Sequence, residues 1–436
     1  MLKLFSSTVC SIAAIGFIAP VSFGMPRENS VLIHQSPKEV IDQVWQIVYR
    51  DYLDSSGSFE AKDWIKLRGR LLSAKYVDSY SSYEAIRGML ASLNDPYTRF
   101  LDPKEFNEMR IETSGELIGV GIQLSLDKKT NDLIVVSPIE GTPAFKAGIK
   151  PKDVIVSVDG QSTIGMSIEN AVKLIRGRKG TQVILGLRRE DELINIRIVR
   201  DKIEINVVDS QLNQTSSGVK IGYIRLKQFN ANSVREMREA INGLEKQDVL
   251  GYVLDLRNNP GGLLEASIEI ARLWLDKGVI VSTETRDGIK SVRRANGRAL
   301  TNSPVVLLVD GGSASASEIL SGAIKDNKRG ILVGQKTFGK ALVQSVRALS
   351  DGSGMTVTVA KYLTPQGRDI NKHGIEPDIK SAMSENDALN FTKEDLATNN
   401  DSQYVDAEIS LLKSIRKAKL NTSYKHNNPN LYYALR

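Results

Sequence analysis

The sequence predicts a multidomain protein of mixed fold class, in which a helical region and a β-rich module precede an α/β core. Three patterns support this prediction. Apolar residues recur at helical spacing over residues 31–108, and short strands bounded by turn residues follow over 115–203. Apolar strands that run into helices dominate from residue 204 to about 385. A chain of 436 residues, 41% of them hydrophobic, is long enough to bury several cores.

Residues 1–24 are predicted to be a signal peptide. Lys3 makes the start positive, residues 9–19 are apolar but too few to form a stop-transfer helix, and small residues precede a cleavage site before Met25. The alternative is an uncleaved anchor. Cys10, the only cysteine, lies in this segment, so the mature chain would have no disulfide and no cysteine-based metal site. We expect an exported protein with no stable membrane span after cleavage.

The basic charge balance does not indicate a nucleic-acid partner. The formal net charge is +7, but lysine and arginine are spread along the chain, and no basic cluster is paired with aromatic residues. We therefore expect a solvated, mildly basic surface, with no nucleic acid, no metal and no other cofactor.

Residues 25–111 are predicted to form the helical region. Ser36 is a candidate N-cap with Pro37 at the first helical position, and Val40 begins an apolar face. Further helical patterns continue until NDPYTRFLDPKEF interrupts them.

Residues 112–203 are predicted to form a compact module of five strands and one helix. The strands are GVGIQLSL, DLIVVSPI, DVIVSVDG, QVILGLRR and INIRIV, and the helix is SIENAVKLIRG. The module starts with a glycine turn, Gly119-Val120-Gly121-Ile122, that leads directly into a strand. Backbone amides of such a turn can bind a carboxylate, and the strand edge can accept an extended peptide. A glycine pair can also simply make a turn.

Residues 204–385 contain two strand–turn–helix units, GYVLDLRNNPGGLLEASIEIARLWL and SPVVLLVDGGSASASEILSGAIK. Strands as apolar as these indicate a sheet covered on its faces. Residues 386–436 are predicted to be a polar linker followed by a helix over about 405–420.

Three serines alternate with alanine in the second unit, where the chain turns from a strand into a helix. The free N–H groups and positive dipole end of a helix N-terminus could stabilise an oxyanion beside a serine hydroxyl. Ser315 is central, with Glu318 three residues on, whereas Ser313 lies nearer the strand and Ser317 is expected within the helix. The alternative is that all three serines only cap the helix and fit a tight turn.

The three histidines are weak candidates for a general base. His34 lies in the leading segment, His426 lies in the polar tail, and His373 lies in a loop with nothing to couple it to a carboxylate. A Ser-His-Asp triad is therefore poorly supported by this sequence.

Lysine can act as the base if burial lowers its pKa. Lys340 follows the next strand after the serine helix, and Gln344 would lie on the same side of an extended segment. Lys340 could equally be one solvated lysine among many. Ser414 and Lys417 match the bare Ser-x-x-Lys spacing, but they lie in a charged helix, and we interpret that match as coincidence.

Several segments together resemble the carboxyl-terminal processing peptidases. They are GSASASEILSGAIKDN, VGQKTFGKALVQ, DLRNNPGG and YLTPQGRDINKHGIEPDI, and GTPAFKAGIKPKDVIVSVDG with the glycine turn resembles a PDZ domain. The resemblance extends to about Ile379. It implies a Ser-Lys endopeptidase with a PDZ domain over 112–203 and a crotonase-like core over 204–385.

The resemblance implies a catalytic constellation for this chain. The nucleophile would be Ser315, the general base Lys340, and the residue that orients the lysine Gln344. The oxyanion hole would consist of backbone amides, those of Ala316, Gly261 and Gly262.

The resemblance also implies a regulatory peptide site. Residues 119–122 of the glycine turn would bind the substrate's C-terminus, and Arg176 would belong to a switch that the PDZ domain controls. A plain surface arginine is the alternative for Arg176. Ala341 departs from the family pattern, which usually has glycine there, and could shift the backbone beside Lys340.

We therefore expect an exported serine endopeptidase that recognises substrate C-termini and removes C-terminal extensions through an acyl-enzyme. Its partners would be proteins or peptides with a free C-terminus, in a periplasm or thylakoid lumen. The N-terminal sequence resembles the photosynthetic branch of this family, whose substrate is the precursor of a photosystem II reaction-centre protein. The alternatives are a non-catalytic PDZ adaptor on an inactive core and a trypsin-like PDZ protease, which the histidine content disfavours.

Overall fold

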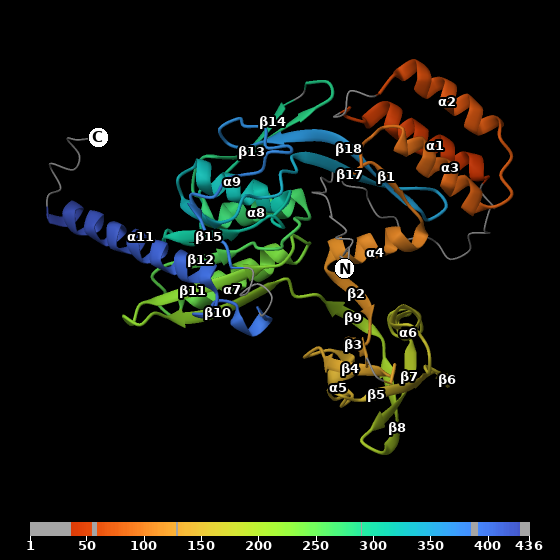
Figure 1. The fold of residues 1–436 in the computed structure, drawn as a ribbon, viewed down its shortest axis with the longest axis horizontal. Coiled ribbons are helices and arrows are strands. Elements are labelled where there is room, and N and C mark those ends of the chain that lie inside the picture. Colours follow the sequence, from red (N-terminus) through yellow and green to blue (C-terminus); the bar gives the residue numbers. More distant parts are fainter. Residues whose placement is uncertain (1–35, 55–58, 128–129, 289, 385–390, 428–436) are drawn as a thin grey trace. The chain divides into compact units, whose positions relative to one another are not determined.

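The computed structural model describes most of the chain, namely residues 36–54, 59–127, 130–288, 290–384 and 391–427 (Figure 1). Two compact units are present. Ser114–Ile205 form one, and the described residues on both sides of that segment form the other. The predicted signal peptide lies outside the described residues. No helix in the described ranges is both long enough and apolar enough to cross a membrane.

The N-terminal region is helical, as predicted. Its helices are α1 (Pro37–Asp51), α2 (Ala61–Ser73), α3 (Ser79–Ala91) and α4 (Pro103–Ser114), with the short strand β1 (Arg99–Leu101) before α4. The Ser36 side chain caps α1 by accepting a hydrogen bond from the Lys38 amide, which confirms the predicted start of this helix.

The core of the larger unit is a six-stranded sheet in the order β10-β11-β12-β15-β16-β19. Its strands are β10 (Val208–Gln214), β11 (Lys220–Leu226), β12 (Tyr252–Asp255), β15 (Val305–Val309), β16 (Gly330–Gly334) and β19 (Ile379–Lys380). All neighbours are parallel except β10 and β11. The carboxyl ends of the parallel strands therefore meet at one edge, where the turns that carry the functional residues begin.

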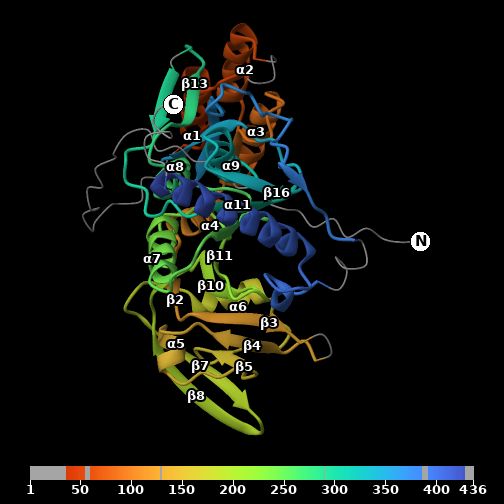
Figure 2. The same cartoon turned by 90° about the vertical axis from the view of Figure 1, so that its left-hand side faces the viewer.

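Helices cover both faces of this sheet, as the apolar strands predict. The helices α7 (Ser233–Glu245), α8 (Leu264–Trp274) and α9 (Ala316–Asp326) pack together on one side. The long helix α11 (Ser402–Asn427) covers the other side, where Tyr404 and Leu411 pack on Tyr223, Val253 and Leu308 (Figure 2). The C-terminal helix is thus longer than the sequence predicts.

A second sheet, entirely antiparallel, completes the larger unit. Its strands are β1, β13 (Val279–Thr285), β14 (Lys290–Arg294), β17 (Leu342–Ala348) and β18 (Gly354–Leu363). The central strand is β18, which pairs with β17, β13 and β1. Because β17 follows Lys340 and β1 belongs to the helical region, this sheet connects the N-terminal part of the chain to the candidate lysine.

The smaller unit is a separate β-rich module. Its main sheet has the order β3-β4-β5-β7-β8, with β6 beside β5 and the pair β2–β9 apart. The strands are β2 (Glu116–Gly119), β3 (Ile122–Leu126), β4 (Leu133–Pro138), β5 (Val154–Val158), β6 (Gln161–Ser162), β7 (Gln182–Arg189), β8 (Glu192–Val199) and β9 (Asp201–Glu204). Two helices, α5 (Pro143–Lys146) and α6 (Ile168–Ile175), pack on a core centred on Val135, Ile155 and Leu185.

Candidate active site

Ser315 occupies a strained turn between β15 and α9. Its backbone has φ 55° and ψ −111°, a combination that residues with a Cβ rarely adopt, and its side chain is fully buried. A serine held in such a strand-to-helix turn is typical of a nucleophile. Of the three serines, the middle one is the one with this unusual backbone, and its role as nucleophile stays a prediction.

The flanking serines tie this turn to the one that follows β12. The Ser313 hydroxyl donates to the Leu256 carbonyl at 2.8 Å, and the Ser317 hydroxyl donates to the Asn259 carbonyl at 2.9 Å. Both side chains are thus engaged in structural hydrogen bonds. Ser313 and Ser317 act as turn and helix residues, in line with their expected positions.

The glycine turn after β12 lies directly against Ser315. A Cβ placed on Gly261 would lie 2.9 Å from the Ala316 amide nitrogen and 3.0 Å from the Ser315 Cβ. Gly261 and Gly262 both have positive φ, at 102° and 138°, so only glycine fits here without strain. The Gly261 amide donates to the Asn259 side chain at 2.9 Å. Of the three amides predicted to stabilise an oxyanion, that of Gly261 is thus already engaged within the turn.

Lys340 is completely buried. Its Nζ has no hydrogen-bond partner among the described residues. Burial and, to a smaller extent, the positive charge of Arg99 lower the pKa of Lys340 to about 7, against the opposing effect of Asp95 and Glu318. A lysine in this environment is substantially neutral near neutral pH, as a general base must be. The alternative of a solvated surface lysine is wrong.

Gln344 is buried as well, in strand β17, which begins two residues after the lysine. Its Nε2 donates to the Thr358 hydroxyl at 3.3 Å across the β17–β18 pair, and its Oε1 has no partner in the described structure. Within the described residues the Gln344 Oε1 and the Lys340 Nζ are thus both buried and unpaired, and an amide oxygen can accept a hydrogen bond from an amine. Ala341 has no positive φ, so its Cβ imposes no left-handed strain beside Lys340.

Glu318 joins the serine turn to the lysine segment. One carboxylate oxygen accepts from the amides of Ser315 and Lys340, both at 2.9 Å. The other accepts from the Gly339 amide at 2.7 Å and the Thr337 hydroxyl at 2.6 Å. Burial raises the pKa of Glu318, and these four donors oppose the shift. The sequence placed Glu318 three residues after Ser315, but its contacts with the lysine segment were not predicted.

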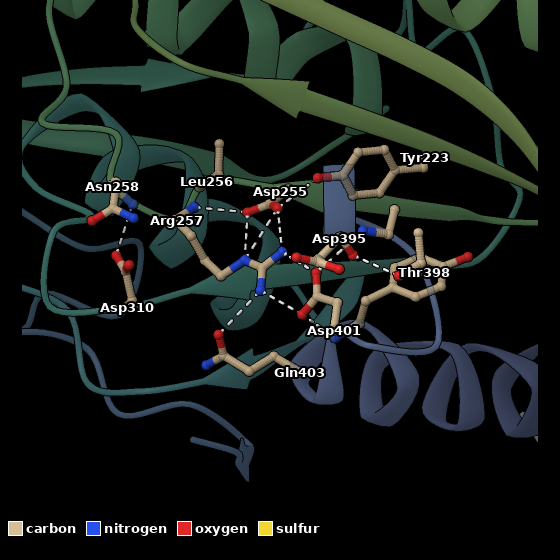
Figure 3. Close-up of polar contacts among 12 residues, drawn as sticks. Tyr223, Asp255, Leu256, Arg257, Asn258, Asp310, Asp395, Thr398, Asp401 and Gln403 are labelled. Carbon is tan, nitrogen blue, oxygen red and sulfur yellow. Dashed lines mark hydrogen bonds and ion pairs between the residues drawn. The ribbon is translucent and has the colours of Figure 1, made fainter. Parts of the chain in front are cut away.

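A buried ion-pair network lies at the end of β12, just before the glycine turn. Arg257 Nη2 is 2.6 Å from the Asp255 carboxylate and 2.7 Å from that of Asp401, at the start of α11 (Figure 3). Tyr223 donates a further hydrogen bond to Asp255 at 2.7 Å. The network fixes the C-terminal helix to the strand that leads to the glycine turn at residues 261–262.

His373 and the pair Ser414 and Lys417, the other candidates from the sequence, show no catalytic geometry. His373 is exposed, and Ser414 donates to the Ser410 carbonyl within α11 at 3.1 Å. His34 lies outside the described residues, and so does the side chain of His426. In the described ranges no cluster of histidine, cysteine, aspartate or glutamate could hold a metal ion.

The glycine turn of the smaller unit leads into an edge strand. Gly121 has φ 82°, and a Cβ there would come within 2.5 Å of Thr142, so the turn requires glycine. The strand that begins at Ile122, β3, pairs with β4 and with no other strand of the described residues. Arg176 ends α6 and lies beside Gly119, whose added Cβ would be 4.0 Å from the Arg176 Cγ. This arrangement offers an open strand edge near a glycine turn and a cation.

Comparison with known proteins agrees with both units. The profile of peptidase family S41 matches residues 220–381, and the PDZ-domain profile matches residues 134–189. The larger unit is thus a peptidase core, and the smaller unit is a PDZ domain.

Full-length relatives identify the family. The chain is 44% identical to a carboxyl-terminal-processing protease of Picosynechococcus over 86% of this chain and 89% of that protein. It is 41% identical to a chloroplastic C-terminal processing peptidase of Tetradesmus obliquus over 78% and 76% of the two chains. A solved structure, that of a photosystem II D1 C-terminal processing protease, is 39% identical with a TM-score of 0.52, covering 79% of this chain and 93% of that one. The chain belongs to the carboxyl-terminal-processing proteases of peptidase family S41.

Proposed function

We propose that this peptidase cuts through an acyl-enzyme formed on Ser315, with Lys340 as the general base. The supporting observation is that a strained, buried serine and a buried lysine of lowered pKa are held to one another by a single carboxylate, that of Glu318. Lys340 would take the proton of Ser315 while the Ser315 oxygen attacks the peptide carbonyl. The Ala316 and Gly262 amides would stabilise the oxyanion, and Gln344 would orient the lysine.

A serine-directed probe tests the nucleophile. A fluorophosphonate is expected to label the mature chain on the peptide that contains Ser315, because the reagent requires an activated hydroxyl. Mass spectrometry of the digested protein identifies the labelled serine. Ser313→Ala is a matched control, since that hydroxyl is engaged with Leu256 and the variant should still label. Labelling of Ser313 or Ser317 in place of Ser315 would contradict the assignment.

The substrate site of the PDZ domain is proposed to be the turn at residues 119–122 together with the open edge of β3. A substrate tail would add as a further strand beside β3, and backbone amides of the turn would bind its terminal carboxylate. Arg176 lies beside this turn and is proposed to couple tail binding to proteolysis.

Removing the charge of the substrate's C-terminus tests this site. A peptide that ends in a carboxamide is expected to raise KM about tenfold relative to the same peptide with a free carboxylate, because charge-assisted hydrogen bonds to the turn are lost. Steady-state kinetics on the two peptides provide the measurement. Equal kinetic constants for both peptides would exclude recognition of the terminal carboxylate.

The site of action is proposed from the relatives and the N-terminal segment. Residues 1–24 carry the features of a signal peptide, and similar proteins come from cyanobacteria and chloroplasts. We therefore place the mature enzyme in a periplasm or thylakoid lumen. The precursor of a photosystem II reaction-centre protein is the proposed substrate, by analogy with the solved relative named for D1 processing.

A further inference from the structure

A loop of the N-terminal region reaches the candidate lysine. The loop joins α3 to β1, and it places the Tyr97 ring so that the Lys340 Nζ lies 3.9 Å from the ring centroid. This contact is notable because the Nζ has no hydrogen-bond partner in the described part of the chain. The ring is therefore a principal neighbour of the atom that would receive the serine proton.

The loop is held firmly in this position. The Asp95 carboxylate accepts from the Tyr97 amide at 2.9 Å and from the Thr98 hydroxyl at 2.7 Å. It also accepts from the Thr358 hydroxyl at 2.7 Å, and Thr358 is the residue that Gln344 contacts. One buried carboxylate therefore sets the position of both Tyr97 and the partner of Gln344.

We propose that Tyr97 is a further catalytic group, whose ring face stabilises the positive charge that develops on Lys340 during acylation. The inference rests on the proposed function, in which Lys340 is the base. As the Ser315 oxygen bonds to the peptide carbonyl carbon, its proton passes to the Lys340 Nζ and the carbonyl oxygen becomes an oxyanion. The ammonium then returns the proton to the leaving amine nitrogen. The ring exchanges no atom, and it acts through its negative face alone.

The charges around Lys340 explain why a ring suits this position. Arg99 disfavours the ammonium, while Asp95 and Glu318 favour it from a distance. Both carboxylates are occupied, Glu318 by four donors and Asp95 by three. A carboxylate in direct contact would keep the lysine charged at rest and unable to accept a proton. A π face is weaker, so it favours the ammonium without locking the lysine in that state.

Ring removal is the test. In Tyr97→Leu, the plateau of kcat/KM should fall roughly tenfold, in keeping with the loss of a desolvated cation–π contact. The acid limb of the pH profile should move to lower pH by about one unit, because an apolar neighbour favours the neutral lysine. Tyr97→Phe keeps the face and should stay within about threefold of wild type with its acid limb unchanged. Tyr97→Trp, with a stronger face, should move the limb to higher pH.

Several outcomes would overturn the proposal. A wild-type profile for Tyr97→Leu would show that the ring has no role, and equal losses in the Phe and Leu variants would assign the role to the hydroxyl. A lower rate with an unmoved or raised acid limb would indicate a merely structural role. Tyr80→Leu is the control, because Tyr80 is 68% exposed on α3 and its loss should change neither quantity. If Tyr97→Leu does not fold, Tyr97→Trp decides the question: an acid limb that moves to higher pH supports the proposal, and one that stays or moves to lower pH overturns it.

A comparison with Lys340→Ala distinguishes a failure of the Tyr97 proposal from a failure of the proposed function. If Lys340→Ala retains wild-type hydrolysis, the proposed base is wrong. If Lys340→Ala is inactive while Tyr97→Leu behaves as wild type, the base stands and only the role of Tyr97 fails.

Discussion

Replacing Lys340 by arginine is expected to reduce kcat/KM for a C-terminal peptide by about 10²- to 10⁴-fold, the usual contribution of a general base. A guanidinium does not deprotonate in proteins, so arginine cannot take the serine proton however well it is placed. Steady-state hydrolysis of a peptide with a free C-terminus measures the loss.

Lys336→Arg is the matched control for this variant. Lys336 lies four residues earlier in the same segment, but it is exposed and pairs with Glu376 at 3.4 Å. Its replacement should leave kcat/KM unchanged. Wild-type activity in Lys340→Arg would exclude the lysine as base and return attention to His373.

The pH dependence of the wild-type enzyme follows from the same residue. Lys340 must be neutral in the free enzyme to act as base, and burial lowers its pKa to about 7. Activity should therefore rise with pH and reach half its plateau near pH 7. A limb near pH 10, the range of an ordinary lysine, would show that Lys340 is not the titrating base.

The fold class could be predicted from the sequence because each part has its own local pattern. Helical spacing, short strands with glycine turns, and apolar strands that run into helices are all visible within windows of about twenty residues. The antiparallel sheet was not predicted. Its central strand, β18, pairs with β1 from the N-terminal region, and such a pairing leaves no local signal.

The site shows the same division between local and distant features. Ser315, Lys340 and Gln344 each lie in a short segment whose residue types suggest chemistry. Tyr97 and Asp95 lie more than 200 residues away in sequence, in the segment that interrupts the helical pattern, and only folding brings them to the lysine. The polar residues of that interruption were a signal, because buried polar groups in a loop usually have partners elsewhere.

The ion pairs of Arg257 have a different relation to the proposed site, since they precede the glycine turn at residues 261–262 and do not include Ser315, Lys340 or Gln344. Burial disfavours the charge of Arg257, but Asp255 and Asp401 outweigh that cost and raise its pKa above the ordinary arginine value. The three side chains are 6% exposed or less. Removing the arginine would break the ion pairs of both carboxylates.

Arg257→Met is therefore expected to lower the free energy of unfolding of the larger unit by about 3–5 kcal/mol, the cost of leaving buried charges unpaired. Urea denaturation followed by tryptophan fluorescence measures this unit alone, because Trp45, Trp64 and Trp274 all lie in it. Asp401→Asn should cost less, since Arg257 keeps its pairing with Asp255.

Asp395→Asn is the control for these variants, because Asp395 bonds only to nearby residues such as Thr392 and Asn400 and should not affect the core. Measuring activity distinguishes a network that only stabilises the fold from one that also holds the glycine turn in position. If α11 holds the glycine turn at residues 261–262 and its proposed oxyanion donor in place, Asp401→Asn should lower kcat at a temperature where the variant is fully folded. KM should be nearly unchanged. If Asp401→Asn is destabilised but its kcat is unchanged, the network contributes to stability alone. The glycine turn would then be positioned by the hydrogen bonds of Asn259 and Ser317.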